Sequence, residues 1–318
     1  MNTQHLTAHL LEITLDRAKA LGVELTRIHQ RQYPPTGPIL LIDLAISANN
    51  QIQKDIADKL SSISSLPSNP DRRIEIFLRS KTYLLSFLHS LMQCIEGADI
   101  QSCPSTFVVP IRRMLMRQLR RSGQTHFDFI VKASHSYNYM IQSISEDIKR
   151  VFIEAGYPNL ITNFPEPFFI IECPISERRN IPIHCIFAHE VGHVWYHISS
   201  LPTTLLPTVQ RPSDNMRRKL IKSKWVEELA ADAIALCLIG PAYLYSTIYF
   251  AGPFCAMSDS SESHPPIGMR IQFLCDMLLN KFSEGGLNYR NTLSDSNLNY
   301  VEQWRSYDLP PKNSNTLT

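Results

Sequence analysis

Two histidines and a glutamate stand at the spacing that a catalytic zinc ion requires. In the stretch His189-Glu190-Val191-Gly192-His193 the histidines are four residues apart, so a helix places both imidazoles on one face. Glu190 then lies beside the open coordination position. A catalytic zinc has three protein ligands and lowers the pKa of its bound water towards neutrality, so a nearby carboxylate can take the proton. The pattern predicts hydrolytic chemistry with Glu190 as general base.

The residues around this stretch favour a helix. Phe187, Val191, Val194 and Ile198 follow one another at spacings of 4, 3 and 4, which gives an apolar stripe on the side opposite the histidines. One face of the helix therefore packs and the other binds. The alternative is a helix with two surface or core histidines and a coincidental glutamate.

The third zinc ligand must come from elsewhere in the chain. His197 lies about 12 Å along the helix axis from His189, at about 1.5 Å per residue, which is too far for one ion. The stretch 225–232 is rich in Leu and Ala and predicts a second helix, with Glu228 and Asp232 on one face. We assign Glu228 as the third ligand.

Asp232 then accepts a hydrogen bond from the free ring N–H of a zinc-bound histidine, which fixes the tautomer of that histidine. Glu227 has Ala231 at the same offset, so it lacks such a companion. The alternative is that Glu227, Glu228 and Asp232 form a solvated acidic face.

These segments resemble the gluzincin metallopeptidases. The residues are His189-Glu-x-x-His193, Glu228-x-x-x-Asp232, and His264-Pro-Pro followed by Arg270. The chain is most similar to the group of CAAX prenyl proteases and heat-shock membrane proteases, over roughly residues 165–280.

The resemblance implies zinc (Zn2+) held by His189, His193 and Glu228. Glu190 is then the base, with His264 and Arg270 near the cleft to bind substrate or stabilise an oxyanion. Tyr243 and Tyr249 are further candidates for the oxyanion. Alternatively, His264 is only a loop residue ahead of a helix that Pro265 and Pro266 begin.

The membrane relatives span the bilayer several times, but this sequence has no clear span. Residues 233–257 carry no Asp, Glu, Lys or Arg, yet Gly240-Pro241 and Gly252-Pro253 interrupt them. We interpret the run as buried helices broken by turns, and expect no membrane span.

Composition indicates a globular protein without general affinity for polyanions. The chain has 318 residues, of which 44% are hydrophobic and 19% charged, with a net charge of +2. Seven cysteines, an odd number, lie mostly in apolar sequence and are expected to behave as small buried hydrophobes. With no secretory signal at the N-terminus, we expect a cytoplasmic location.

The elements predict an α+β fold, predominantly α-helical, with a zincin-like catalytic part and a small sheet next to the HExxH helix. We expect a helical region at 1–157, a catalytic domain at 158–284 and a polar, partly disordered tail at 285–318. Residues 168–171 are a predicted strand, which could hold an extended peptide if it lies at an edge. Residues 200–224 are interpreted as a long surface connection.

An arginine-rich segment favours a different function. Five arginines at 112, 113, 117, 120 and 121 accompany an apolar stripe of Ile111, Leu115 and Leu119. A solvated helix face explains them better than nucleic-acid binding. We therefore expect a peptide or protein substrate and no nucleic-acid partner. The alternative is a regulatory or nucleic-acid/protein-binding protein whose zinc site is structural or vestigial, and Glu190 favours the enzyme because a structural site needs no base.

Overall fold

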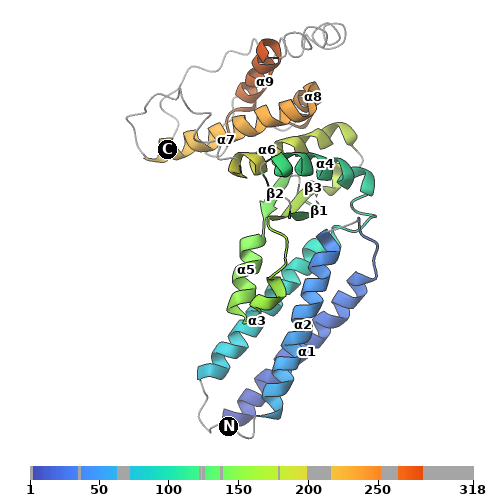
Figure 1. Cartoon of the computed structure of the whole chain (residues 1–318), viewed down its shortest axis with the longest axis vertical. Coiled ribbons are helices and arrows are strands. Elements are labelled where there is room, and N and C mark those ends of the chain that lie inside the picture. Colours follow the sequence, from blue (N-terminus) through green and yellow to red (C-terminus); the bar gives the residue numbers. More distant parts are fainter. Residues whose placement is uncertain are drawn as a thin grey trace. The chain divides into compact units, whose positions relative to one another are not determined.

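The computed structural model describes residues 3–34, 37–62, 72–121, 123, 126–136, 139–177, 180–198, 216–251 and 264–281. Helices dominate these residues, and three strands form one sheet (Figure 1). The helices are α1 (Thr3–His29), α2 (Gly37–Ser61), α3 (Arg72–Glu96), α4 (Ser105–Arg121), α5 (Ser145–Glu154), α6 (Phe187–Ile198), α7 (Met216–Ile239), α8 (Pro241–Ala251) and α9 (Ile267–Lys281). Short 3-10 helices are η2 (Pro158–Ile161), η3 (Ile175–Glu177) and η4 (Ile181–Ile186), and the strands are β1 (Asp128–Ser134), β2 (Met140–Ser143) and β3 (Phe168–Pro174).

The chain divides into two compact units. The first unit contains residues 1–109 and 124–178, and the second contains residues 110–123 and 179–318. This division differs from a boundary at residue 157, because the strand β3 pairs with β1 and therefore belongs with the preceding elements. The expected C-terminal tail at 285–318 lies outside the described residues.

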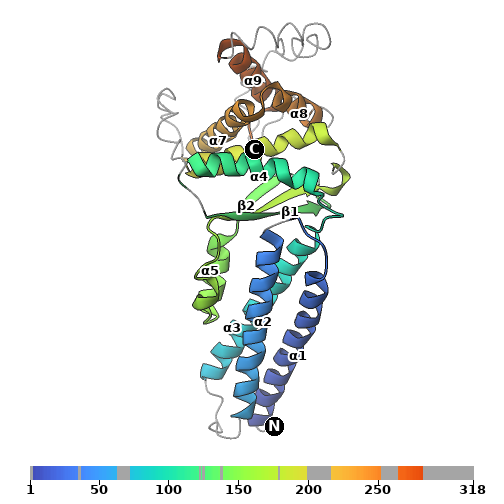
Figure 2. The same cartoon turned by 45° about the vertical axis from the view of Figure 1, so that its right-hand side comes forward.

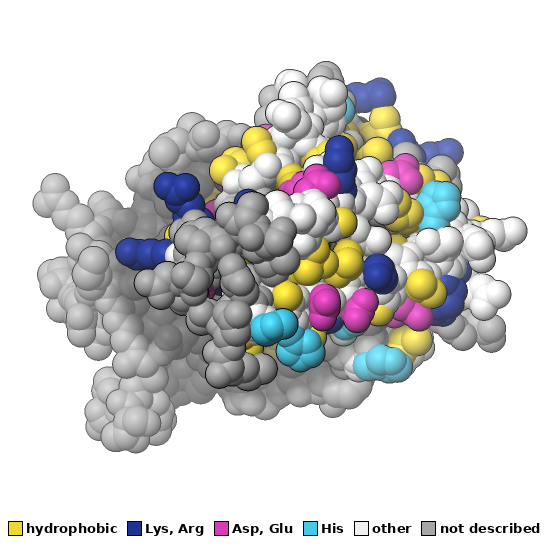
Figure 3. All heavy atoms as spheres, turned by 90° about the horizontal axis from the view of Figure 1, so that it is seen from below, with side chains coloured by type: hydrophobic (Ala, Val, Ile, Leu, Met, Phe, Trp, Pro, Cys, Tyr) yellow, Lys and Arg dark blue, Asp and Glu magenta, His cyan; other side chains and the backbone are white. Residues whose placement is uncertain are grey.

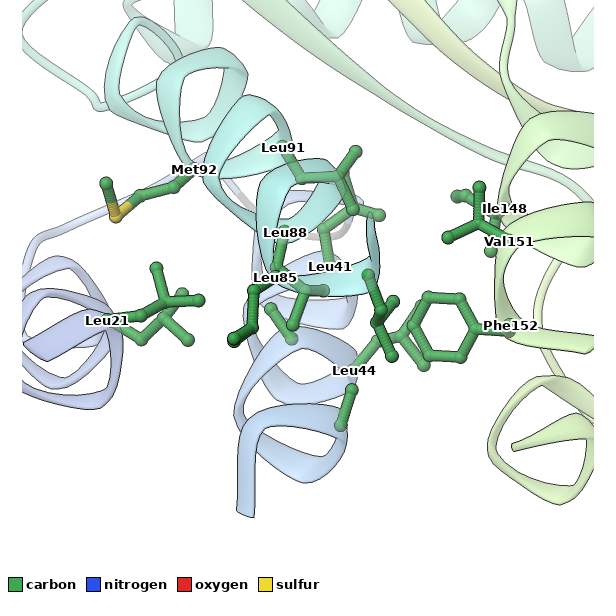
Figure 4. Packing of buried hydrophobic residues seen from close by; sticks show 14 of the residues in the cluster. Leu21, Leu41, Leu44, Leu85, Leu88, Leu91, Met92, Ile148, Val151 and Phe152 are labelled. Carbon is green, nitrogen blue, oxygen red and sulfur yellow. The ribbon is translucent and has the colours of Figure 1, made fainter. Parts of the chain in front are cut away.

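In the first unit, α1, α2 and α3 run side by side as a bundle, and α5 packs against α3 (Figures 1 and 2). Ile148, Val151 and Phe152 of α5 point towards Leu44 of α2 and Leu88 of α3 (Figure 4). All of these side chains are buried. Helices α1, α2, α3, α4 and α5 lie within the expected helical region at 1–157.

The sheet has the order β1-β3-β2, with β3 parallel to β1 and antiparallel to β2. Four successive residues of β3, from Phe168 to Ile171, are buried, which explains its continuous apolar sequence. The strand is thus confirmed, and it is the central strand of the sheet. The condition for holding an extended peptide, a position at the edge, is therefore not met, because neighbours on both sides use its backbone groups. Strands β1 and β2 lie within residues 1–157, which were predicted to be helical, so the prediction was wrong for these two segments.

In the second unit, α7 and α8 meet at Gly240, whose φ of +66° favours glycine. Pro241 then begins α8, so the predicted break in the apolar run 233–257 is confirmed there. Helix α7 begins at Met216, within the stretch interpreted as a connection, and residues 199–215 lie outside the described residues. Among the described residues, no helix has the length and apolar character that crossing a bilayer requires.

The arginine-rich segment is the amphipathic helix α4. Ile111, Leu115 and Leu119 are buried, as their spacing predicts. Arg113 and Arg117 are exposed. These positions fit a solvated basic face.

The fold class is confirmed as α+β with mostly helices. The zincin-like arrangement stays a prediction, because the sheet belongs to the first unit and the helix of the HExxH motif to the second. Cys103, Cys173 and Cys275 are buried, whereas Cys237 is exposed, so the expectation of buried thiols was wrong at that position. Cys237 lies on α7 between two leucines, and a helix turns neighbouring residues to different sides.

Candidate metal centre

Helix α6 carries the HExxH motif. Phe187, Val191 and Val194 are almost completely buried, so the predicted apolar stripe packs in the core of the unit. The side chain of Ile198 lies outside the described residues, as does that of His197. Because the stripe fixes the rotation of α6 about its axis, His189 and His193 project together from another face.

Three side chains meet at one point. His189 Nε2 lies 3.0 Å from His193 Nε2 and 3.2 Å from Glu228 Oε2, and His193 Nε2 lies 3.4 Å from Glu228 Oε1. A tetrahedral zinc with ligands at 2.0–2.2 Å separates neighbouring ligand atoms by about 3.3 Å. The structure therefore brings the three predicted ligands together at separations that one zinc ion fits.

A close contact between α6 and α7 positions Glu228. A Cβ atom added to Gly192 would lie 2.6 Å from the backbone oxygen of Ala231 and 2.8 Å from its Cα. Only glycine therefore permits this approach of the two helices. Ala231 lies between the two predicted acidic residues of α7, so the glycine within the HExxH motif determines how near both acids come to the histidines.

The far side of the His189 ring is held by α7 and α8. Its Nδ1 lies 2.8 Å from Asp232 Oδ1, as expected for a carboxylate that fixes the tautomer of a metal ligand. The buried Tyr243 hydroxyl donates a hydrogen bond to the same Asp232 oxygen and lies 3.2 Å from His189 Nδ1. Tyr243 thus contacts the ring side away from the ligand atom, which does not fit the oxyanion role considered for it.

Arg270 binds the same carboxylate from α9. Its Nε and Nη2 donate to the two oxygens of Asp232 at 2.8 and 2.6 Å, and Nη1 lies 3.6 Å from Glu228 Oε2. These contacts do not fit the expected role of Arg270 in binding substrate, because a buried aspartate engages two of its three guanidinium nitrogens. Arg270 instead links Asp232 and Glu228.

Sequence reasoning missed Glu227. Its Oε1 lies 3.1 Å from His193 Nδ1, so it holds the second histidine as Asp232 holds the first. The search for a companion four residues along the helix excluded it wrongly, because the relevant neighbour is on α6 rather than α7. A signal was present in the sequence: two adjacent acids on a helix can reach two histidines that are themselves one turn apart.

The remaining predicted residues lie at different depths. Glu190 is half-buried in the first turn of α6. His264, just before α9, is exposed, with its Nε2 at 3.5 Å from Glu228 Oε1. Both earlier readings of His264 are compatible with this position: it precedes a helix, and it lies beside the cluster. Tyr249 is 59% exposed on α8.

Burial and neighbouring charges shift the pKa values of the cluster. Burial and the charge of Arg270 lower the pKa of His189, but Asp232 and Glu228 outweigh them and raise it to about 9. Burial and the positive charge on His189 lower the pKa of His193. Burial would raise the pKa values of Glu228 and Asp232, but the neighbouring histidines and Arg270 lower both. The carboxylates therefore stay ionised.

The donor set fits a divalent cation. Three carboxylates (Glu227, Glu228 and Asp232) and one guanidinium (Arg270) leave two negative charges when the imidazoles are neutral. In addition, Glu228 Oε2 is buried and forms no hydrogen bond within the described part of the chain, although His189 Nε2 lies 3.2 Å and Arg270 Nη1 3.6 Å from it. A buried carboxylate oxygen without a donor is costly unless a cation satisfies it. Imidazole and carboxylate ligands without thiolates suit zinc.

Comparison with known proteins found no relative: no family model, no curated protein and no solved structure matches this chain.

Proposed function

We propose that this protein is a zinc-dependent metallopeptidase. The observation that supports the proposal is the meeting of His189 Nε2, His193 Nε2 and the Glu228 carboxylate at separations of 3.0 to 3.4 Å. Among the described residues the site has three ligands, which leaves a fourth position for water or substrate, as in catalytic zinc sites. The resemblance to gluzincins, which rests on the same residues, supports peptides as the substrate class.

Zinc in such a site supplies a Lewis acid and an acidified water. Glu190 accepts a proton from the attacking water and later delivers it to the leaving amine, the role of a general acid and base. His264, exposed beside Glu228, is the remaining candidate for contact with the substrate carbonyl. Proton transfer by Glu190 and substrate contact by His264 both require these side chains to lie beside the fourth coordination position, which the protein ligands leave open.

The other residues act by positioning. Asp232 and Glu227 accept hydrogen bonds from the Nδ1 atoms of the two histidines, which leaves each Nε2 free to bind metal. Arg270 and Tyr243 in turn hold Asp232. A network of this kind keeps the ligands in place and makes them better donors.

A structural or vestigial zinc site is the competing assignment. A structural site closes all four positions with protein ligands and has no use for a carboxylate between the histidines. The three-ligand set and Glu190 favour catalysis over that alternative.

The test is digestion of a peptide library by the purified full-length protein, analysed by mass spectrometry. We expect cleavage that a zinc chelator abolishes and that added zinc restores. The Glu190→Gln variant, prepared in parallel, controls for contaminating proteases because it should bind zinc and not cleave. Equal cleavage by the variant and the wild type, or no cleavage by zinc-loaded wild type, would overturn the proposal.

A further inference from the structure

The N-terminal half of α1 has a wider apolar surface than its neighbours cover. Leu11, Thr14 and Ala18 lie in the core of the bundle. Leu6, Leu10 and Ile13 form a second stripe at spacings of 4 and 3, and they remain 43, 43 and 37% exposed. A helix whose apolar arc exceeds its packed face has room for a further partner.

Helix α3 has a matching exposed stripe. The stripe consists of Arg72, Ile76, Arg79 and Tyr83, which follow one another at spacings of 4, 3 and 4. Ile76 is 59% and Tyr83 47% exposed. Together the two stripes line a groove of about 1440 Å³. Of the exposed large hydrophobic side chains in the described part of the chain, five lie in this one groove. Figure 3 views the molecule from below with respect to Figure 1, and hydrophobic side chains reach the surface there between charged ones.

The shape of the groove matches a helix. Along α1, the lining extends from Leu6 to Arg17, which is about 16 Å at 1.5 Å per residue. A helix of twelve residues is about 18 Å long and therefore spans the lining. Within the same unit, α5 already packs against the α2 and α3 side of the bundle with Phe152 (Figure 4). The groove between α1 and α3 is a comparable packing site for a helix, and no described element fills it.

The charges of the lining indicate the chemistry of the occupant. Arg17 on one wall and Arg72 and Arg79 on the other have no ion pair with any described residue. Glu75 and Glu154 also line the groove, so arginines are in excess by three to two. Arginine and tyrosine beside apolar side chains are the residues that dominate binding energy in protein interfaces.

We propose that this groove binds an amphipathic helix of a partner protein, with acidic residues flanking its apolar face. The apolar side of that helix packs on Leu10 and Ile76, at positions spaced i, i+3 or i+4, and i+7. Its carboxylates pair with Arg17, Arg72 and Arg79. This binding is independent of zinc chemistry in the second unit.

The test is selection of a displayed library of helical peptides on the full-length protein, followed by anisotropy measurements with the enriched peptides. We expect apolar residues at the stated spacing with an excess of Asp and Glu. Ile76→Glu, and the combined Arg17→Glu, Arg72→Glu and Arg79→Glu variant, should each weaken binding at least tenfold. Both alter exposed side chains, and circular dichroism checks the fold. Val23→Glu is the control, since Val23 is 68% exposed on α1 outside the groove.

Several outcomes would overturn the proposal. These are the absence of enriched peptides, enriched peptides without acidic bias, and binding that the groove variants leave unchanged. A dimer seen by sedimentation that Ile76→Glu dissociates would assign the groove to a second copy. Co-flotation with phosphatidylglycerol vesicles, lost in the same variant, would assign it to a membrane surface.

Discussion

Each of the two units buries a polar cluster built around one basic residue, and the two clusters differ in how their charges are satisfied. In the first unit, Lys81 is 5% exposed and its Nζ donates to the Ala155 oxygen at 2.9 Å and lies 3.2 Å from Asp55 Oδ2. The Tyr157 hydroxyl and the Gln51 amide donate to the two oxygens of Asp55. The Tyr157 ring lies under the ammonium group, 3.9 Å from its centroid.

In the second unit, Arg270 satisfies Asp232 in the same way, with two hydrogen bonds. Glu228, however, keeps a buried oxygen that forms no hydrogen bond with any described residue, and two imidazole nitrogens and Arg270 Nη1 lie close to this carboxylate. We call a cluster closed when its polar atoms satisfy one another, and such a cluster stabilises the fold. We call a cluster open when a polar atom is left without a hydrogen bond and potential ligand atoms converge beside it, and such a cluster has the properties of a binding site. The difference implies that substitutions in the first cluster change stability and those in the second change metal binding and catalysis.

The largest expected effect is that of Glu190→Gln. Loss of the general base should lower the rate of peptide hydrolysis by roughly 10²- to 10⁴-fold. Zinc content, measured by elemental analysis, should stay at the wild-type value because Glu190 is not a ligand in this assignment. Glu146→Gln, an exposed change on α5, is the matched control. Retention of the original rate would remove Glu190 from its role.

Lys81→Met tests the closed cluster. Removal of the ammonium group leaves the partly buried Asp55 carboxylate without its cation, which should lower the free energy of unfolding by about 3 kcal/mol. Urea denaturation measures the change, and zinc affinity should be unaffected. Lys54→Met, at an exposed position on α2, should change stability by less than about 0.5 kcal/mol. Equal effects of the two variants would show that the Lys81 cluster contributes no more than surface charge.

Gly192→Ala tests the contact that brings the two halves of the open cluster together. The new methyl group would lie 2.6 Å from the Ala231 oxygen, so α6 and α7 must separate. We expect a loss of roughly 1–3 kcal/mol of stability together with weaker zinc binding. Calorimetry of zinc binding and thermal unfolding report the two effects. A variant that binds zinc as the wild type does would contradict the role given to this glycine.

Glu227→Gln separates positioning from ligation. The loss of a carboxylate partner for His193 should weaken zinc binding by about 10- to 100-fold. Glu228→Ala should weaken it further, because that change removes a ligand as well as a charge. Titration against a chromophoric chelator gives both affinities. The reverse order of the two effects would identify Glu227 as the ligand.

The last prediction concerns pH. The pKa of His189 is about 9 in the metal-free protein, above its ordinary value of 6.5, so the ring carries a proton at pH 7 that zinc must displace. Zinc affinity should therefore rise about tenfold per pH unit up to pH 9. In the metal-free protein, the stability contributed by this proton is present below pH 6.5 and is lost as the pH rises to about 9. Zinc affinity that does not vary between pH 6 and 9 would contradict the protonated state.

The meeting of His189, His193 and Glu228 could be predicted from the sequence because helical geometry relates positions four residues apart. The spacing of His189 and His193, and of Glu228 and Asp232, carries this information without any tertiary structure. Strand β3 was also predictable, since its buried residues form an apolar run.

Residues whose roles depend on contacts between elements could not be predicted. Glu227 matters because α7 packs on α6, and Arg270 turns towards Asp232 because α9 crosses the same helix. The central position of β3 depends on pairing with β1, 40 residues away in the register Asp128 with Phe168. Strand order of this kind is set by tertiary packing and leaves no local pattern.

The most direct test of the metal centre is zinc K-edge X-ray absorption on protein loaded with one equivalent of zinc. We expect two imidazole nitrogens and oxygen ligands at about 2.0–2.2 Å, with no sulfur. Sulfur scattering at about 2.3 Å, or a spectrum without imidazole ligands, would contradict the assignment of His189, His193 and Glu228.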